Sequence, residues 1–178
     1  MRLCLIRFNI LKQNSIIMQL PLNREWTLWF DSPNLHKSYK EYSRELSWKQ
    51  NLCCVYKINS IPTFWQTYNN ITEPNNMCYK SAYYLFVSNT APHSMDINNL
   101  NGTTLCFNIL KGNNLNNIWL RTVLLFLGEN IKYSEYINGI SLKKNKKQYE
   151  LTLWTKTKNP DICNFFINYF TRKYNEEI

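Results

Sequence analysis

The chain has 178 residues, with 21 lysines and arginines against 12 aspartates and glutamates, and a formal net charge of +9 at pH 7. This length fits one domain with a sizeable hydrophobic core, and the positive charge favours an anionic partner such as a nucleotide or RNA. The apolar runs are far shorter than the roughly 20 residues of a transmembrane helix, which argues against a membrane protein.

Cysteine and histidine usage gives no sign of a metal site. The cysteines form no C-x-x-C pair, and the histidines are not spaced with them as zinc ligands. We therefore expect a reducing compartment, no structural metal and no cofactor. We interpret the frequent asparagines as a compositional bias of the loops. The cysteines and histidines are Cys4, Cys53, Cys54, Cys78, Cys106, Cys163, His36 and His93.

Residues 1–19 are predicted to be an N-terminal tail, followed by one domain over residues 20–178. Basic residues interrupt the apolar runs of the tail, so it does not resemble a secretory signal. Its basic, acid-free composition allows three interpretations: a transit peptide, a loose tail, or translation that begins at Met18.

The first strand is predicted at Leu20–Phe30, because Trp26, Leu28 and Phe30 alternate along it. A polar, basic stretch follows as a long loop, and a second strand is expected at Cys53–Ile58. The apolar, β-branched character of that segment is typical of a strand.

A helix is predicted to begin after Ser60, which suits the N-cap, with Pro62 in its first turn. The helix is expected to run to about Asn70. Its spacing leaves Ile61 and Trp65 together at i and i+4 on the outer side, away from the core.

The third and fourth strands are predicted at Ala82–Val87 and Leu105–Leu110. Between them lies an asparagine-rich loop, Thr90–Gly102, that contains His93 and Asp96. We expect strands on both sides because each apolar run is short and bounded by turn-forming residues.

The most regular segment is Asn116–Glu129, a predicted helix with Asn116 or Asn117 as its N-cap and Gly128 as a left-handed residue at its end. Leu120, Leu124 and Leu127 lie away from the expected core face, so the helix is apolar nearly all round. Such a helix is either fully buried or offers a second face to a partner. The expected core face consists of Ile118, Trp119, Thr122, Val123, Leu125 and Phe126.

The last part of the chain is predicted to be a hairpin and a helix. Asn138-Gly139 is interpreted as a turn before a strand at Ile140–Lys144. After a basic tip, Tyr149–Thr155 returns as a strand, with Leu151, Leu153 and Thr155 on one face and Thr152 and Trp154 on the other. A final amphipathic helix is expected at Ile162–Tyr174. The element order favours an α+β fold, with one antiparallel sheet and its helices on one face.

Six motifs, in order, resemble the mRNA cap-binding translation initiation factor 4E family. They are P-L-N-R-E-W-T-L-W-F at Pro21–Phe30, W-K-Q-N-L at Trp48–Leu52, F-W-Q-T-Y-N at Phe64–Asn69, I-W-L-R-T-V-L-L-F-L-G-E at Ile118–Glu129, N-G-I at Asn138–Ile140 and L-W-T at Leu153–Thr155. The resemblance implies a curved antiparallel sheet of about six strands, with three helices on its convex face and the 7-methylguanosine cap on its concave face. The family's last strand pair has no counterpart in this sequence.

The resemblance implies a cap site with aromatic and basic residues. Trp48 matches the first stacking tryptophan, and Trp154 matches the tryptophan that contacts the N7-methyl group. Lys147 matches a phosphate-binding base, with Lys143 and Lys144 close to it. A methylated guanine is a cationic ring, so stacking on tryptophan gains cation–π attraction, and lysines suit the triphosphate.

The predicted cap loop departs from the family pattern. Ser94 and Met95 stand where the family has its second stacking tryptophan and a guanine-binding carboxylate. His93 and Asp96 are one residue out of register with these positions. They either replace the missing groups or are loop residues without a role in binding.

The resemblance also implies an adaptor-binding surface on the convex face, where the family binds a helix with the pattern Tyr-x-x-x-x-Leu-hydrophobic. Arg121 stands where the family often has glutamate, so a basic residue in the partner is not favoured there. The matching residues are Pro21, Ile61, Trp65, Leu120, Leu124, Gly128 and Glu129.

The sequence suggests three possible functions. The first is a cytoplasmic, monomeric, non-enzymatic factor that binds capped mRNA and recruits an initiation factor 4G-like adaptor or a 4E-binding protein. The second is an adaptor-binding member with weak or no cap recognition, acting as a repressor or in a cap-independent role. The third, an enzyme acting on nucleotides, is disfavoured because the sequence shows no glycine-rich phosphate loop and no nucleophile beside a base.

Overall fold

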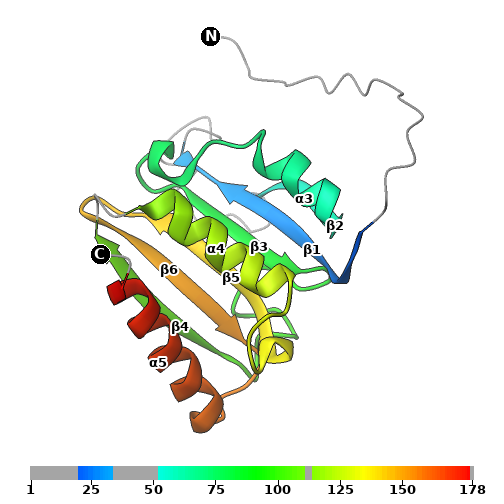
Figure 1. Cartoon of the computed structure of the whole chain (residues 1–178), viewed down its shortest axis with the longest axis vertical. Helices are drawn as coiled ribbons and strands as arrows, with labels where there is room; N and C mark the ends of the chain where they lie inside the picture. The colour runs from blue at the N-terminus through cyan, green and yellow to red at the C-terminus, as the bar shows by residue number, and fades with distance from the viewer. Residues whose placement is uncertain (1–19, 34–51, 111–113, 177–178) are drawn as a thin grey trace.

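The computed structural model describes residues 20–33, 52–110 and 114–176, which form one six-stranded antiparallel sheet and three α-helices (Figure 1). The strand order is β2-β1-β3-β5-β6-β4. The strands are β1 (Pro21–Asp31), β2 (Cys53–Ser60), β3 (Ala82–Val87), β4 (Thr103–Leu110), β5 (Ile137–Lys144) and β6 (Gln148–Thr155). The helices are α3 (Ile61–Tyr68), α4 (Leu115–Leu127) and α5 (Pro160–Glu176), with short 3-10 turns η2 (Pro74–Asn76) and η3 (Ser134–Tyr136).

All three helices lie on one side of the sheet, the helical face, as Figure 1 shows. Four residues that are neighbours across β1, β3, β5 and β6 form the floor of the core: Leu28, Leu85, Ile140 and Leu153. The helices cover this floor with large buried side chains, among them Phe64, Trp119, Phe126, Phe166 and Phe170. This arrangement confirms the predicted α+β fold with helices on one face.

The opposite side of the sheet, the open face, carries the alternate residues of the same strands. Successive side chains of a strand point to opposite faces, so each central strand serves both surfaces. On β6, for example, Leu153 is fully buried in the core, whereas Trp154 lies half-buried on the open face. The predicted alternation of Leu151, Leu153 and Thr155 against Thr152 and Trp154 is thereby confirmed.

Helix α3 begins as predicted. The Ser60 side chain accepts a hydrogen bond from the backbone N–H of Thr63, and the Thr63 side chain accepts one from the Ser60 N–H, which forms a capping box. The helix ends at Tyr68, two residues earlier than expected. Ile61 and Trp65 are on its outer side, 42% and 38% exposed.

Helix α4 differs from the prediction at both ends. Its N-cap is Asn114, whereas the Asn116 amide accepts from the Asn75 N–H and donates to the Glu73 carboxylate. At the other end Gly128 has ordinary right-handed geometry, and the left-handed residue is Glu129, with a φ of 53°. Tertiary contacts of the side chains therefore override the local capping preferences.

The core face of α4 is largely as predicted, with Ile118, Trp119, Thr122, Val123 and Phe126 all buried. Leu127 is also buried, which corrects the expectation that it points away from the core, and Leu125 is only half-buried. Leu124 is 37% exposed and Leu120 is half-buried, so this helix does offer apolar side chains on a second face.

The predicted turn at Asn138-Gly139 is wrong, because both residues lie inside β5. Glycine is needed at position 139 for a different reason. A Cβ atom at Gly139 would lie 2.4 Å from the ring of Phe86, its neighbour on β3. Gly139 therefore leaves space for an aromatic ring over the sheet.

None of the helices within residues 20–33, 52–110 and 114–176 is long and apolar enough to cross a membrane. Within the same ranges, no group of three or more His, Cys, Asp or Glu side chains is placed to hold a metal ion.

Candidate functional site

The centre of the open face is an aromatic pair fixed by the sheet. Phe86, Gly139 and Trp154 are register neighbours on β3, β5 and β6. The Phe86 ring is fully buried and meets Trp154 edge to face, with ring centroids 5.5 Å apart. The Trp154 Nε1 donates a hydrogen bond to the Ser141 hydroxyl at 3.3 Å. Trp154 is thus held in place while part of its ring stays accessible.

The predicted basic residues divide between the two faces. Lys143 is exposed on the open face, opposite Glu150 in register, and Lys147 is exposed in the turn between β5 and β6. Lys144 follows Lys143 along the strand and so points to the helical face. There its Nζ donates to the Asn75 carbonyl at 2.9 Å. Strand alternation therefore places Lys144 on the opposite face from Lys143, which corrects the expectation that Lys144 assists Lys143 and Lys147.

The loop Thr90–Gly102 is shaped by the two side chains that were candidates for the cap site. The Asp96 carboxylate accepts hydrogen bonds from the Ala91 N–H at 3.0 Å and the Asn98 N–H at 2.9 Å. His93 Nδ1 accepts from the Met95 N–H at 3.2 Å. The Asp96 and His93 side chains thus have a structural role in the loop.

Asparagines tie this loop to the sheet. Asn138 on β5 donates to the Asn98 carbonyl at 2.6 Å and to the Asn99 side-chain oxygen at 3.0 Å. Asn99 in turn donates to the carbonyls of Ala91 and His93, both at 2.9 Å. The interpretation of these asparagines as mere compositional bias is therefore wrong for this loop. Asn99 and Asn138 are both buried, and buried side-chain amides need hydrogen-bond partners of this kind.

Replacing Asp96 by alanine is expected to lower the free energy of unfolding by about 1–2 kcal/mol, because two backbone N–H groups lose a charged acceptor. Urea denaturation would measure the change. Ser94→Ala, at an exposed position of the same loop, is the control and should leave stability unchanged. Equal stability of the Asp96→Ala variant and the parent chain would contradict the structural role of this carboxylate.

Trp48, the other predicted stacking residue, lies outside the described residues. Ser94 and Met95 are both exposed, Met95 to 78%. The structure therefore brings together Trp154, Lys143 and the turn that carries Lys147 as parts of one sheet face and its edge, with the His93–Asp96 loop joined to β5.

The helical face has a groove of about 260 Å³ between β1, α3 and α4. Four of its residues, Ile61, Trp65, Leu124 and Gly128, were predicted from the sequence. Three others, Leu22, Phe64 and Leu127, were not. Leu22 has the same strand alternation as Trp26 and Leu28, so the pattern along β1 could have indicated it. The full lining is Leu22, Ile61, Phe64, Trp65, Leu124, Leu127 and Gly128.

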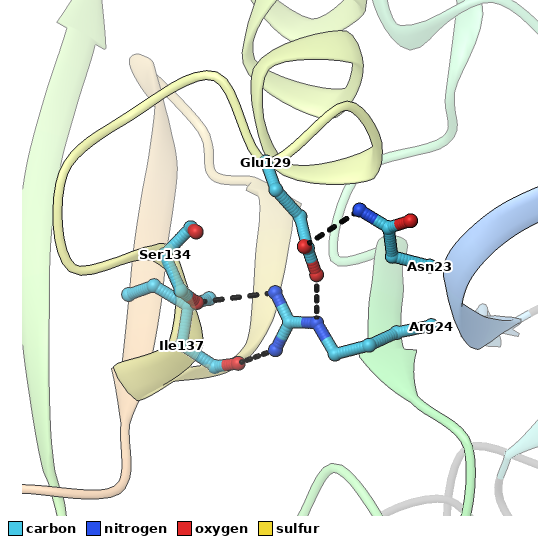
Figure 2. A network of polar contacts seen from close by, with 5 residues as sticks. All are labelled: Asn23, Arg24, Glu129, Ser134 and Ile137. Atoms are coloured by element: carbon cyan, nitrogen blue, oxygen red, sulfur yellow. Dashed lines mark hydrogen bonds and ion pairs between the residues drawn. The ribbon is translucent and has the colours of Figure 1, made fainter.

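The remaining predicted residues lie beside this groove. Pro21 is exposed at the start of β1, next to Leu22, and Leu120 is one turn before Leu124 on α4. Glu129 follows Gly128, and its carboxylate points toward β1 (Figure 2). Arg24 on β1 forms an ion pair with Glu129 and was not predicted from the sequence.

A larger hollow of about 570 Å³ lies on the outer side of α5, lined by Phe165, Asn168, Tyr169, Arg172 and Lys173. None of the predicted site residues lines it, so it is separate from both surfaces described above.

An antiparallel sheet with a fixed tryptophan on one face and an apolar groove between β1, α3 and α4 on the other defines an α+β domain with two separate candidate binding surfaces. The model of the family described as eukaryotic initiation factor 4E matches residues 21–173. The chain belongs to the eukaryotic initiation factor 4E family.

Relatives and solved structures agree with this assignment. The eukaryotic translation initiation factor 4E of Saccharomyces cerevisiae is 34% identical over 143 residues, which is 79% of this chain and 64% of that protein. That of Candida albicans is 35% identical over 141 residues, 76% of this chain and 64% of that protein. The chain thus spans a little under two thirds of the length of these relatives.

Two structures from nematodes match most of the chain. One is Ascaris suum eIF4E-3 with m7G cap, with a TM-score of 0.76 and 26% identity over 89% of this chain and 86% of that one. The other is Caenorhabditis elegans eIF4E-3 with the 4E-binding protein Mextli and a cap analog, with a TM-score of 0.74 and 25% identity over 88% and 85%.

Proposed function

We propose that the chain is a non-enzymatic, cytoplasmic translation initiation factor that binds the 7-methylguanosine cap of mRNA on its open face and an adaptor on its helical face. The observation that carries the proposal is the placement of Trp154, half-buried and fixed by Phe86 and Ser141 on the side of the sheet away from the helices. The Ascaris suum structure, which has a similar fold, contains m7G cap.

The chemistry of the open face suits a methylated guanine nucleotide. The ring of 7-methylguanine carries a positive charge, so contact with a tryptophan gains cation–π attraction in addition to burial. Stacking of a base on an aromatic side chain contributes about 1–3 kcal/mol. Trp48 is proposed to supply that stacking, and Lys143 and Lys147 would attract the phosphates.

The helical face suits an amphipathic helix of an initiation factor 4G-like adaptor or a 4E-binding protein. Its groove is lined almost entirely by apolar side chains, and three large ones are more than a third exposed: Ile61, Trp65 and Leu124. Exposed aliphatic and aromatic residues beside a groove are typical of sites that bind a helix by anchors at i, i+3, i+4 and i+7. The nematode relative bound to Mextli supports the same kind of partner.

A titration of tryptophan fluorescence with 7-methyl-GTP tests the cap assignment. We expect quenching that depends on the methyl group, with GTP binding much more weakly. Trp48→Ala should weaken binding about 5- to 150-fold, the equivalent of one lost stacking contact. Ile167→Ala, at an exposed position of α5 on the helical side, is the control and should bind like the parent chain.

Equal and weak binding of both nucleotides would contradict cap recognition. The remaining function would then be that of an adaptor-binding member of the family without cap recognition. Binding of a Tyr-x-x-x-x-Leu-hydrophobic peptide to the same preparation would distinguish this outcome from a misfolded protein.

A further inference from the structure

Glu129 lies beside the helical-face groove, and its carboxylate accepts hydrogen bonds from two side chains of β1. Figure 2 shows Glu129 extending from the end of α4 toward Asn23 and Arg24. Arg24 Nε donates to one carboxylate oxygen at 2.5 Å, and Asn23 Nδ2 donates to the other at 3.1 Å. Both oxygens therefore already have a donor from the protein itself.

Arg24 is itself fixed from several sides. Its two remaining nitrogens donate to the Ser134 and Ile137 carbonyls, both at 3.1 Å. Its guanidinium carbon is 5.0 Å from the ring centre of Trp26, which is fully buried. The planar guanidinium uses its fork of donors in a single orientation, so it cannot turn away from Glu129 without losing the two carbonyl partners.

This ion pair is shielded more than an ordinary surface pair. The side chains of Arg24 and Glu129 are 22% and 24% exposed. In contrast, Lys57 and Glu25 on the neighbouring strands are 4.0 Å apart with side chains 68% and 40% exposed. Pairs of the second kind contribute little to stability or binding, and their groups remain available to solvent and to partners.

Glu129 also has an uncommon backbone conformation at the end of α4. The residue adopts the left-handed conformation, which is unfavourable for a side chain other than glycine, asparagine or aspartate. It directly follows Gly128 and Leu127, which line the groove. In this conformation Glu129 contacts Arg24, 105 positions away in the sequence.

We propose that Arg24 is a positioning and specificity-determining residue of this groove. By engaging Glu129, it removes the carboxylate that would otherwise attract a lysine or arginine of the bound helix. The groove then selects its partner by the fit of apolar side chains, without a preference for a basic residue beside them. This inference depends on the proposed binding of an adaptor helix at the groove.

The test compares three helical peptides with the pattern Tyr-x-x-x-x-Leu-hydrophobic that differ only by lysine, glutamine or glutamate at the positions flanking the apolar face. Fluorescence anisotropy would give their affinities for the full chain. For the parent chain we expect the lysine and glutamine peptides to bind equally. In Arg24→Gln the lysine peptide should bind about 3- to 5-fold more tightly than the glutamine peptide, the range of a newly formed exposed ion pair.

Two variants separate this effect from loss of structure or of net charge. Lys57→Gln removes the same charge from an exposed pair and should leave the lysine-to-glutamine ratio unchanged. Arg24→Gln combined with Glu129→Gln should return the ratio to one. A general loss of structure would weaken all three peptides together and would not change this ratio.

The parent chain alone can also overturn the proposal. If it prefers the lysine peptide, and Glu129→Gln abolishes that preference, then Glu129 is available to partners and Arg24 does not engage it. This readout remains valid even if Arg24→Gln fails to fold. If none of the three peptides binds the parent chain, the proposed adaptor function itself fails and the inference fails with it.

Discussion

Replacing Gly102 by alanine is expected to lower the free energy of unfolding by about 3 kcal/mol or more. Gly102 lies just before β4, against the end of β6. A Cβ atom there would be 1.7 Å from the carbonyl oxygen of Thr155 and 3.2 Å from that of Asn99. Both are backbone atoms, so relief requires β4 and β6 to separate at this end rather than a side chain to rotate.

Thermal unfolding of the Gly102→Ala variant would check this expectation. For a chain of this size, about 3 kcal/mol corresponds to a fall in Tm of roughly 6–12 °C. Asn101→Ala, at the exposed preceding position, is the matched control and should unfold like the parent chain. Because Trp154 directly precedes Thr155, the variant should also bind 7-methyl-GTP more weakly. An unchanged Tm would show that the chain does not approach so closely at Gly102.

Replacing Trp65 by alanine is expected to weaken binding of a Tyr-x-x-x-x-Leu-hydrophobic peptide by about 2–4 kcal/mol, or roughly 30- to 1,000-fold. The indole is 38% exposed beside the groove and packs edge to face on Phe64 and Tyr68, at 4.9 Å and 6.1 Å between ring centres. A large, rigid ring held at the margin of an apolar groove is typical of a binding hot spot.

Fluorescence anisotropy with a labelled peptide would measure this loss, and Gln66→Ala provides the matched control. Gln66 is the next residue of α3 and is exposed, but it does not line the groove. Cap-analogue binding should be retained by both variants, since Trp65 and Trp154 lie on opposite sides of the sheet. Parent-like affinity of Trp65→Ala would place the peptide elsewhere on the molecule.

Features governed by neighbouring residues were predictable from the sequence. The N-cap at Ser60, the helix that follows it and the outward position of Ile61 and Trp65 all follow from local spacing, and the structure confirms each of them. Strand alternation likewise placed Trp154 on the face opposite Leu153. These signals lie within a few residues of one another, where periodicity and capping preferences act directly.

Features governed by distant residues were not predictable. Gly128 was predicted to be the left-handed end of α4, but the left-handed residue is Glu129, which contacts Arg24 on a distant strand. Gly139 was predicted to be part of a turn, but it lies in a strand and leaves space for the ring of Phe86 on the neighbouring strand. The Arg24 network joins β1, α4, η3 and β5, and no local pattern could have indicated it.

The alternation of Leu153 and Trp154 has a consequence for how this domain can evolve. Substitution at Trp154 or Lys143 alters the open face, while Leu153 and Leu142, on the same strands, preserve the core. An insertion or deletion of one residue within β6 would exchange the two sets, because every following side chain would change sides. The open face can therefore diverge by amino-acid replacement, but not by inserting or deleting an odd number of residues within the strand.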